Sequence, residues 1–421
     1  MTKHIMNHRV VITGIGMCTP LGLDTASTWN SLIRGQSGIG RITHFDPTGF
    51  VTTIAGEVKG FEATNFMSPK DARRMDRFSQ LAVAASREAL SQSRLTIDSS
   101  NAETIGVIIG SGMGGISTHF QQTQTLLAEG PSRISPLTFP LLTPDMAAGQ
   151  VSIVFGAKGP NFCVSSACAS GADSIGIAFE KIQAGNCSVV IAGGAEACIT
   201  PIAIAGFNAL KALSKRNDTP EGASRPFDAS RDGFVMSEGA AILILEKEEF
   251  ARERGAKIIA EVVSYGACVD AHHITQPSEN GEGSARSMRL ALSKAGLQPN
   301  QINYINAHGT STVLNDAIET QAIKSVFGEY AHSLAISSTK SMTGHMIGAA
   351  GAAEAAFCAL AISNGILPPT INLENHDDNC DLDYIPNKAR PQRINYAMSN
   401  SFGFGGHNSI LIIGRHGEAH R

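Results

Sequence analysis

The chain has 421 residues, of which 43% are hydrophobic and 17% charged, and its formal net charge at pH 7 is −4. This length suits two or three domains, or two halves that share one interface, and the apolar content supports a large buried core rather than disorder. The acidic balance excludes a general attraction to nucleic acid.

The N-terminal apolar stretch is short and interrupted by Gly14, Gly16 and Pro20. It therefore predicts a strand and a turn rather than a signal peptide. No run of about 18 apolar residues is evident, so we expect no membrane span. The eight Cys form no CxxC pair and no zinc-like cluster with His. We therefore expect a soluble, cytoplasmic protein without disulfides.

Short β-branched runs alternate with helical patterns along the chain, which predicts an α/β fold with buried sheets. The expected strands are 10–12, 105–109, 188–191, 241–245, 258–263, 302–305, 334–337 and 409–413, and the expected helices are 79–91, 170–184, 285–295 and 349–363.

The first Gly-rich segment, GSGMGG at 110–115, fits the G-x-G-x-x-G fingerprint of dinucleotide sites and follows an expected strand. Glu129 stands where an acid that binds the ribose would be expected. However, residues 130–144 contain four Pro and no buried strand, so the βαβ unit does not close. We therefore consider a nucleotide site the weaker interpretation of this segment.

Cys168 lies in VSSACASG, between a strand and a helix. A thiol at a helix N-terminus meets unpaired N–H groups and the positive end of the dipole, and both favour the nucleophilic thiolate. Small neighbours leave room for a substrate. The alternative is an ordinary buried Cys, which is how we interpret the other seven.

His308 in NAHGTST follows an expected strand, and His345 in STKSMTGHMIGAAG begins the second small-residue helix. The dipole at a helix N-terminus and the nearby Lys340 disfavour an imidazolium, so we expect a neutral His345. Either His taken alone is more often a structural residue. With Cys168, however, they form three reactive groups at corresponding strand ends, where ligands of α/β sheets gather.

Residues 399–408, SNSFGFGGHN, are expected to form a tight loop before the last strand. Gly403, Gly405 and Gly406 permit close backbone approach or hinge motion. The alternative is a Gly-rich turn with Phe402 and Phe404 in the core.

The two small-residue helices give the chain a weak internal symmetry. The strand 161–165 leads into one, and the strand 335–338 leads into the other. We predict a duplicated α/β unit with an N-terminal half, 1–253, that holds the nucleophilic Cys and a C-terminal half, 254–421, that holds the two His and the Gly-rich loop. A coincidence between two Gly-rich βα units is the alternative.

Taken together, the segments around Cys168, His308, Lys340, His345 and Phe404 resemble the elongating β-ketoacyl-acyl carrier protein synthases, in particular the type II synthases of bacterial fatty-acid synthesis. The resemblance runs through nearly the whole chain. It implies a thiolase-like fold with duplicated α-β-α-β-α layered halves, and a homodimer.

The resemblance also implies roles. Cys168 accepts the acyl group, its N–H and that of Phe404 form an oxyanion hole, and His308 and His345 stabilise the enolate left when malonyl carrier loses CO₂. The implied substrate-binding residues are Thr310, Thr312, Met113 and His273. The implied charged network joins Lys340 to Asp316, Glu319 and Glu354. A monovalent cation is implied near Asn306, Glu354, Ser399 and Asn400; no other cofactor is.

The implied partner is an acidic acyl carrier protein, and no nucleic-acid or membrane partner is expected. Two basic clusters are candidates for docking: Lys70, Arg73, Arg74 and Arg77, and Lys211, Lys215 and Arg216. The alternative is a solvated helix face paired with Asp71 and Asp76.

Three residues depart from the usual pattern of this family: Val313, where Pro is usual, and Ser166 and His407, where Thr is common. Two rivals lack support, because a degradative thiolase carries a second Cys in the Gly-rich loop and a chain-length factor lacks the nucleophile. A ketosynthase of a type II polyketide or polyene pathway would keep every residue named above and stays an alternative, as does a structural α/β protein.

Overall fold

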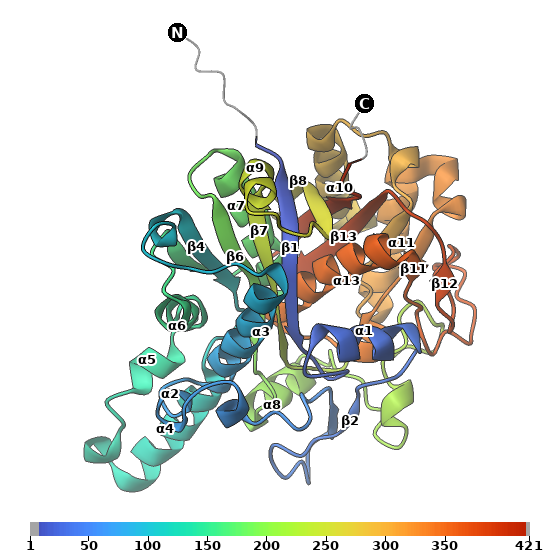
Figure 1. Cartoon of the computed structure of the whole chain (residues 1–421). Helices are drawn as coiled ribbons and strands as arrows, with labels where there is room; N and C mark the ends of the chain where they lie inside the picture. Colours follow the sequence, from blue (N-terminus) through green and yellow to red (C-terminus); the bar gives the residue numbers. More distant parts are fainter. Residues whose placement is uncertain (1–7, 418–421) are drawn as a thin grey trace.

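The computed structural model of the protein describes residues 8–417, and a ten-stranded sheet runs through its centre (Figure 1). The strands of this sheet are β1 (Val10–Cys18), β4 (Ile105–Gly110), β5 (Asn161–Val164), β6 (Val189–Glu196), β7 (Gly239–Lys247), β8 (Ala260–Val269), β9 (Tyr304–Asn306), β10 (Ala335–Ser337), β13 (Tyr396–Gly403) and β14 (His407–Gly414).

The strand order is β10-β9-β13-β14-β8-β1-β7-β6-β4-β5. Counted outward from the β1–β8 contact, the strand order is β1-β7-β6-β4-β5 in the first half and β8-β14-β13-β9-β10 in the second. In each half the first strand along the chain is followed by the fifth, fourth, second and third, so the two halves have the same topology. β1 and β8 pair antiparallel over Val10–Ile12 alone. The predicted duplication is therefore present, whereas the boundary between residues 253 and 254 stays a prediction.

The helices flank the sheets in layers, as the predicted α-β-α-β-α arrangement requires. The longer helices are α1 (Thr25–Ile33), α3 (Arg77–Ser93), α4 (Ile116–Glu129), α6 (Met146–Phe155), α7 (Ser170–Gln183), α8 (Pro201–Ala209), α10 (Glu282–Ala295), α11 (Val313–Phe327) and α13 (Ala350–Asn364). The shorter elements are α2 (Pro69–Ala72), α5 (Thr138–Leu142), α9 (Glu248–Glu253), α12 (Lys340–Thr343), β2 (Gly40–Arg41), β3 (Ile54–Ala55), β11 (Ile366–Leu367) and β12 (Arg390–Pro391).

Alternate side chains of the central strands enter different cores. In β7, Leu243 packs in the core around α7 and α13, whereas Ile242 and Ile244 pack on the opposite face with α3 and α6. In β14, Leu411 faces the core around α7 and α13, and Ile412 faces α10 and α11. Because both faces of the ten-stranded sheet are buried in each half, the sequences of the strands are continuous runs of apolar residues.

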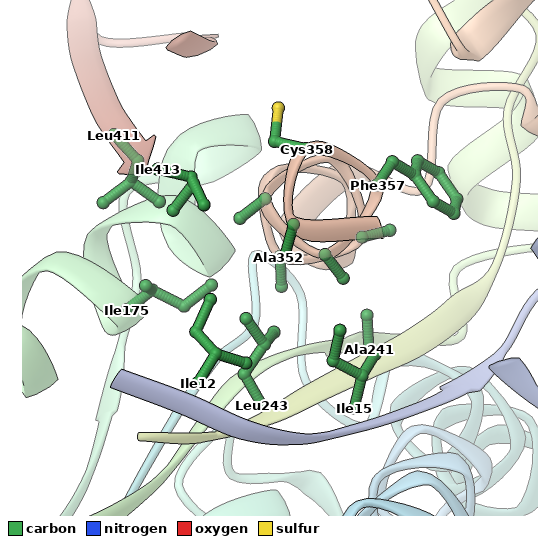
Figure 2. Packing of buried hydrophobic residues seen from close by; sticks show 14 of the residues in the cluster. Ile12, Ile15, Ile175, Ala241, Leu243, Ala352, Phe357, Cys358, Leu411 and Ile413 are labelled. Carbon is green, nitrogen blue, oxygen red and sulfur yellow. The ribbon is translucent and has the colours of Figure 1, made fainter. Parts of the chain in front are cut away.

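α7 and α13 form the middle layer. Figure 2 shows α13 end-on, with Leu411 and Ile413 on one side and Ile12, Ile15 and Leu243 on another. The contact between the two helices requires small residues, because a Cβ on Gly171 would lie 2.7 Å from the Gly348 carbonyl oxygen and one on Gly351 2.9 Å from the Ala172 nitrogen. The small residues of the two helices thus permit their close packing.

Residues Ile347–Asn364, which include α13, are long and apolar enough by composition to cross a membrane. This segment was not recognised in the sequence as such a run. In the fold, 83% of it is buried, so it serves as the central core helix.

The main error of the sequence analysis concerns residues 399–408. Instead of a loop, they form a hairpin in which β13 continues to Gly403 and β14 begins at His407. β13 pairs with β14 on one side and with β9 on the other. The neighbouring strands supply the ladder hydrogen bonds, so a run of Ser, Asn and Gly becomes a strand although its own residues do not favour one.

Candidate active site

Three strand–helix connections bring Cys168, His308 and His345 into one cavity of about 400 Å³. Cys168 lies between β5 and α7, His308 follows β9, and His345 lies between α12 and α13. Phe404, at the turn of the β13–β14 hairpin, lines the same cavity. The four residues come from both halves of the chain, which the fold brings together at one end of the middle layer.

Cys168 stands on a strained turn. Ala167 has a φ of 52°, a region that residues with a side chain rarely occupy. The Ser170 hydroxyl accepts a hydrogen bond from the Ser166 N–H at 2.9 Å and donates one to the Ala167 carbonyl at 2.6 Å. These bonds hold Cys168 immediately before the first turn of α7.

The hairpin turn packs directly on this nucleophile turn. A Cβ on Gly403 would lie 2.7 Å from the Ser166 carbonyl oxygen and 3.2 Å from the Cys168 nitrogen, so Gly is required there. The backbone N–H groups of Phe404 and of Cys168 itself both stabilise the ionised form of the Cys168 thiol. The resemblance assigns these same two N–H groups to an oxyanion hole.

Burial raises the pKa of the Cys168 thiol to about 11, although Lys340 and the N–H of Phe404 act in the opposite direction. The N–H groups therefore favour the thiolate, as expected, but they do not outweigh burial. Removal of the thiol from water outweighs the stabilisation that the helix end and the nearby cation supply.

The two imidazole rings are 5.4 Å apart between centroids and nearly perpendicular, at 86°. Burial lowers the pKa of both His308 and His345 well below the usual value, and the charge of Lys340 lowers each further. Both rings are therefore neutral, as the sequence predicts for His345. Each neutral ring has one N–H with which it can donate a hydrogen bond.

Lys340 decides which nitrogen of His308 carries the proton. Its Nζ lies 3.3 Å from His308 Nδ1 and forms a buried ion pair with Glu354. An ammonium group can only donate, so Nδ1 accepts and the ring proton resides on Nε2. His308 thus retains Nε2–H as its donor.

Buried carboxylates hold the loop that carries His308. Glu319 accepts hydrogen bonds from the N–H groups of His308 at 2.9 Å and Gly309 at 2.8 Å. Asp316 accepts one from the Phe227 N–H at 2.9 Å. Burial raises the pKa of Asp316 and Glu319, and that of Glu354 to about 7. Lys340 is paired with Glu354, whereas Asp316 is paired with Arg231 and Glu319 also accepts from Asn400. All four residues of the implied network are buried, and their action as one network stays a prediction.

The four residues assigned to substrate binding do not lie together. Thr310 and Thr312 line the cavity, and their hydroxyl oxygens are 2.9 Å apart. Met113 is not among the cavity-lining residues but packs in an apolar cluster that includes Cys168. His273 lies on an exposed loop outside the lining, where its Nδ1 accepts from the Thr275 N–H at 3.2 Å.

The buried side-chain oxygens without a hydrogen-bond partner include Glu354 Oε2, Ser399 Oγ and Asn400 Oδ1. All three belong to residues that the resemblance assigns to a monovalent cation. The fourth, Asn306, makes a long 3.5 Å contact with Thr339. Carboxylate, hydroxyl and amide oxygens suit a hard cation, so the donor set fits. Within residues 8–417, no group of three or more His, Cys, Asp and Glu side chains could hold a metal ion.

Glu196 is a site residue that the sequence analysis missed. Its carboxylate, fully buried at the end of β6, accepts hydrogen bonds from the N–H groups of Gly112 at 2.7 Å, Met113 at 3.1 Å and Gly348 at 3.0 Å. It therefore ties the GSGMGG segment to the turn before α13. An acidic residue that ends a buried apolar strand was the available signal.

A second missed residue is Arg231, which is buried and donates to the carbonyl oxygens of Thr312 at 3.1 Å and Val313 at 2.9 Å. It fixes the start of α11 beside the cavity mouth. Val313 itself is 63% exposed there, and His407 lines the cavity.

The basic clusters differ in what their members contact. Arg77 is engaged with the buried Glu238 at 2.7 and 2.8 Å, and Arg216 donates to the Ser230 carbonyl at 2.7 Å. Both are therefore structural. The other members are exposed: Lys70, Arg73, Arg74, Lys211 and Lys215. Of these, Lys211 lines the cavity mouth.

Comparison with known proteins adds two family matches. Residues 7–251 match the N-terminal domain of β-ketoacyl synthases, and residues 259–374 match their C-terminal domain. Together these matches cover most of the chain and include the segments of Cys168, His308 and His345.

Full-length relatives are also similar. A 3-oxoacyl-[acyl-carrier-protein] synthase 2 from Synechocystis is 51% identical over 96% of this chain and 97% of its own, and one from Staphylococcus aureus is 51% identical over 97% and 98%. Among solved structures, a β-ketoacyl synthase from Burkholderia phymatum has a TM-score of 0.91 at 40% identity, covering 97% of this chain and 99% of its own. A type II polyketide ketosynthase solved with its acyl carrier protein has a TM-score of 0.89 at 35% identity, covering 97% and 100%.

Proposed function

Because the chain belongs to the β-ketoacyl synthase family, we propose that it is a 3-oxoacyl-[acyl-carrier-protein] synthase, an acyltransferase that elongates fatty acyl chains by two carbons. The observation that carries the proposal is the convergence of Cys168, two neutral His and two backbone N–H donors in one cavity. This set can both accept an acyl group and stabilise an enolate.

In the first step, the Cys168 sulfur attacks the thioester carbonyl of an acyl carrier. The N–H groups of Cys168 and Phe404 bind the oxyanion, the bond to the carrier sulfur breaks, and the carrier thiol leaves with the Cys proton. Since the thiol is protonated in the empty site, loss of its proton must accompany attack.

In the second step, malonyl carrier occupies the same cavity. Its carboxylate leaves as CO₂, and the electron pair moves to the thioester oxygen, where His308 and His345 donate hydrogen bonds. The enolate carbon then attacks the acyl-Cys carbonyl and the C–S bond breaks. Cys168 leaves as thiolate and regains a proton from water, and the product is a 3-oxoacyl carrier.

The direct test supplies acyl carriers of graded length together with malonyl carrier and analyses the products by mass spectrometry. We expect one CO₂ for each 3-oxoacyl carrier, two carbons longer than the acyl donor. The proposal fails if the acyl group is hydrolysed without condensation, or if malonyl carrier is not consumed.

A polyketide ketosynthase is the second candidate, because one similar solved structure is a type II polyketide ketosynthase at 35% identity. Another, at 36% identity, is a ketosynthase with its chain length factor. The 51% identity to fatty-acid-type synthases favours the first candidate. Without a ketoreductase, a polyketide enzyme would extend its own unreduced product repeatedly. We expect a single extension in that assay.

We propose that Glu354, Ser399 and Asn400, with Asn306, hold a monovalent cation behind the His308 loop. Their three unpartnered oxygens support this site. The thermal midpoint should rise with added K⁺ or Na⁺ and not with tetramethylammonium at equal ionic strength. Ser399→Ala should reduce the difference, and an equal response to all three salts would contradict the site.

We propose an acyl carrier protein as partner and a homodimer as the assembly. Within residues 8–417, β5 pairs on one side alone, with β4, and an unpaired strand edge is a template for another chain. On α6, which packs against β5, Ile153 is 73% exposed, and on nearby α5, Phe139 is 72% exposed. This face suits a second copy, which would cover both.

Light scattering after size exclusion tests the assembly. Ile153→Asp should give monomers at concentrations where the wild type is a dimer. Val51→Asp is the matched control, since Val51 is another exposed apolar side chain, 54% exposed, on a different segment. A monomeric wild type would refute the homodimer. We also propose a cytoplasmic location, which cell fractionation would check.

A further inference from the structure

Behind the nucleophile lies a chain of three buried side chains that the mechanism above does not use. The Ser166 hydroxyl donates to Asp173 Oδ2, and the Tyr265 hydroxyl donates to Asp173 Oδ1 at 2.8 Å. The three residues are 6%, 8% and 8% exposed. The Asp173 carboxylate therefore accepts hydrogen bonds from two buried hydroxyl groups, one from each half of the protein.

These three hydrogen-bonded side chains join three parts of the structure. Ser166 is two residues before Cys168, Asp173 lies in the first turn of α7, and Tyr265 lies in β8 of the second half. The Tyr265 ring lies flat against Gly176, where a Cβ would lie 2.2 Å from it. Since burial and the Asp173 carboxylate raise the pKa of the phenol, Tyr265 stays protonated and acts as the donor.

The Ser166–Cys168 turn, which these hydrogen bonds hold, is under strain. Ala167 has a φ of 52°, and Ser166 lies outside the regular regions at φ −130° and ψ 44°. The backbone of Ser166 is fixed by Ser170 on one side and by the close approach of Gly403 on the other. Its side chain is fixed by Asp173 alone, apart from packing. A strained turn persists where its surroundings determine it fully.

We propose that Asp173 and Tyr265 are positioning residues that hold the Ser166–Cys168 turn in its strained form. They thereby keep the Cys168 N–H aligned with that of Phe404 when the acyl group is transferred. This inference rests on the proposed function and deepens it. It concerns the acyl-transfer step, because the two His lie on other segments with their own supports. Glu319 and Lys340 hold His308, and backbone hydrogen bonds to Val235 and Ser237 hold His345.

The test compares Tyr265→Phe and Ser166→Ala, each of which removes one hydroxyl, with Ser166→Thr, which keeps it. Tyr330→Phe is the matched control, since Tyr330 donates to the Ile302 carbonyl at 3.0 Å in the outer part of the second half. For each protein, three quantities are measured: the rate of Cys168 acylation by mass spectrometry, kcat and KM for elongation, and the rate of malonyl decarboxylation.

We expect acylation and kcat to fall at least fivefold in Tyr265→Phe and Ser166→Ala, with KM and decarboxylation within twofold of wild type. Ser166→Thr and Tyr330→Phe should retain most of the acylation rate. The double variant of Tyr265→Phe and Ser166→Ala should lose little more than the worse single variant, because either change breaks the same chain.

Wild-type acylation in both single variants would overturn the proposal. So would an equal loss of acylation and decarboxylation, which would indicate a general structural role. If one variant does not fold, by circular dichroism, the other decides, because each removes a separate hydroxyl. A wild-type protein that does not elongate at all would refute the proposed function instead, so the two failures are distinguishable.

Discussion

At Cys168, two physical effects act in opposite directions. The position before α7 and the nearby Lys340 favour the thiolate, whereas burial in an apolar cluster disfavours it. Burial prevails in the site without substrate. The thiol is therefore protonated near neutral pH, although it is half-buried and lines the cavity.

This balance predicts how the thiol responds to pH. Because its pKa is raised to about 11, the thiolate fraction increases about tenfold per pH unit below that value. The rate of Cys168 alkylation by iodoacetamide should therefore still be rising at pH 10. Site-resolved mass spectrometry must be used, since other Cys are present. A plateau near pH 7 would mean that the helix end prevails over burial.

The division of labour between Cys168 and the His pair gives a second prediction. Cys168→Ala should abolish elongation, because no acyl-enzyme forms, but leave malonyl decarboxylation measurable, because His308 and His345 stay in place. His308→Ala should show the reverse loss, with acylation of Cys168 retained. Elongation by the Cys168→Ala protein would contradict the assignment.

The buried His pair also affects stability. The folded-state pKa of His308 and of His345 lies well below the usual 6.5. Below about pH 6.5 the unfolded chain therefore binds protons that the folded chain does not. As the pH falls, the free energy of unfolding decreases by up to about 1.4 kcal/mol per pH unit for each His. Above about pH 6.5 both His are neutral in the folded and in the unfolded chain, so the pair no longer makes the free energy of unfolding depend on pH.

Urea unfolding between pH 5 and 7.5 checks this expectation. Buried carboxylates such as Glu354, whose pKa is raised to about 7, act in the opposite direction, so the wild-type slope alone does not isolate the pair. The difference between wild type and the double variant His308→Gln, His345→Gln does. The double variant should lose less stability on acidification, and equal slopes would contradict the prediction.

At the scale of elements, the GSGMGG segment shows how a fingerprint can be present without its function. The N–H groups of Gly112 and Met113, which would bind a phosphate in a dinucleotide site, are occupied by the Glu196 carboxylate. An internal anion thus takes the place of a ligand. The segment instead presents Met113 to the apolar cluster beside Cys168.

Met113 therefore bears on chain length. We predict that an acyl chain attached to Cys168 extends into this cluster past Met113, a long and flexible side chain. Met113→Gly should shift the preference toward longer acyl carriers. Met67→Gly, a buried Met in a different core cluster, should lower stability and leave the preference unchanged. An unchanged profile for Met113→Gly would mean that this residue is core filling.

At the scale of the whole molecule, exposed cations stand against an overall charge of −4. Lys211 lines the cavity mouth, and Arg74 is exposed in the other basic segment. We expect an acidic carrier to contact both of them. Contacts of this kind chiefly set encounter rates and are screened by salt.

Charge reversal at Arg74 and Lys211 should therefore raise KM for carrier-bound substrate and spare a small pantetheine thioester. Added salt should weaken the wild type more than this double variant. Lys257→Glu, a reversal at an exposed site outside the cavity lining, is the control and should leave KM unchanged. If KM rises equally for both substrates, or if added salt does not change KM of the wild type, the carrier does not dock at these residues.

The sequence by itself determined the α/β class and the duplicated unit, and it indicated Cys168, His308 and His345 as candidate site residues, because apolar periodicity and local strand–helix patterns are encoded by near neighbours. It did not reveal β13, whose Ser, Asn and Gly become a strand because β9 and β14 lie beside it. Nor did it indicate Glu196, or that Arg77 is held by Glu238. The protonation of Cys168 was decided by tertiary structure alone, since desolvation depends on what distant segments place around a side chain.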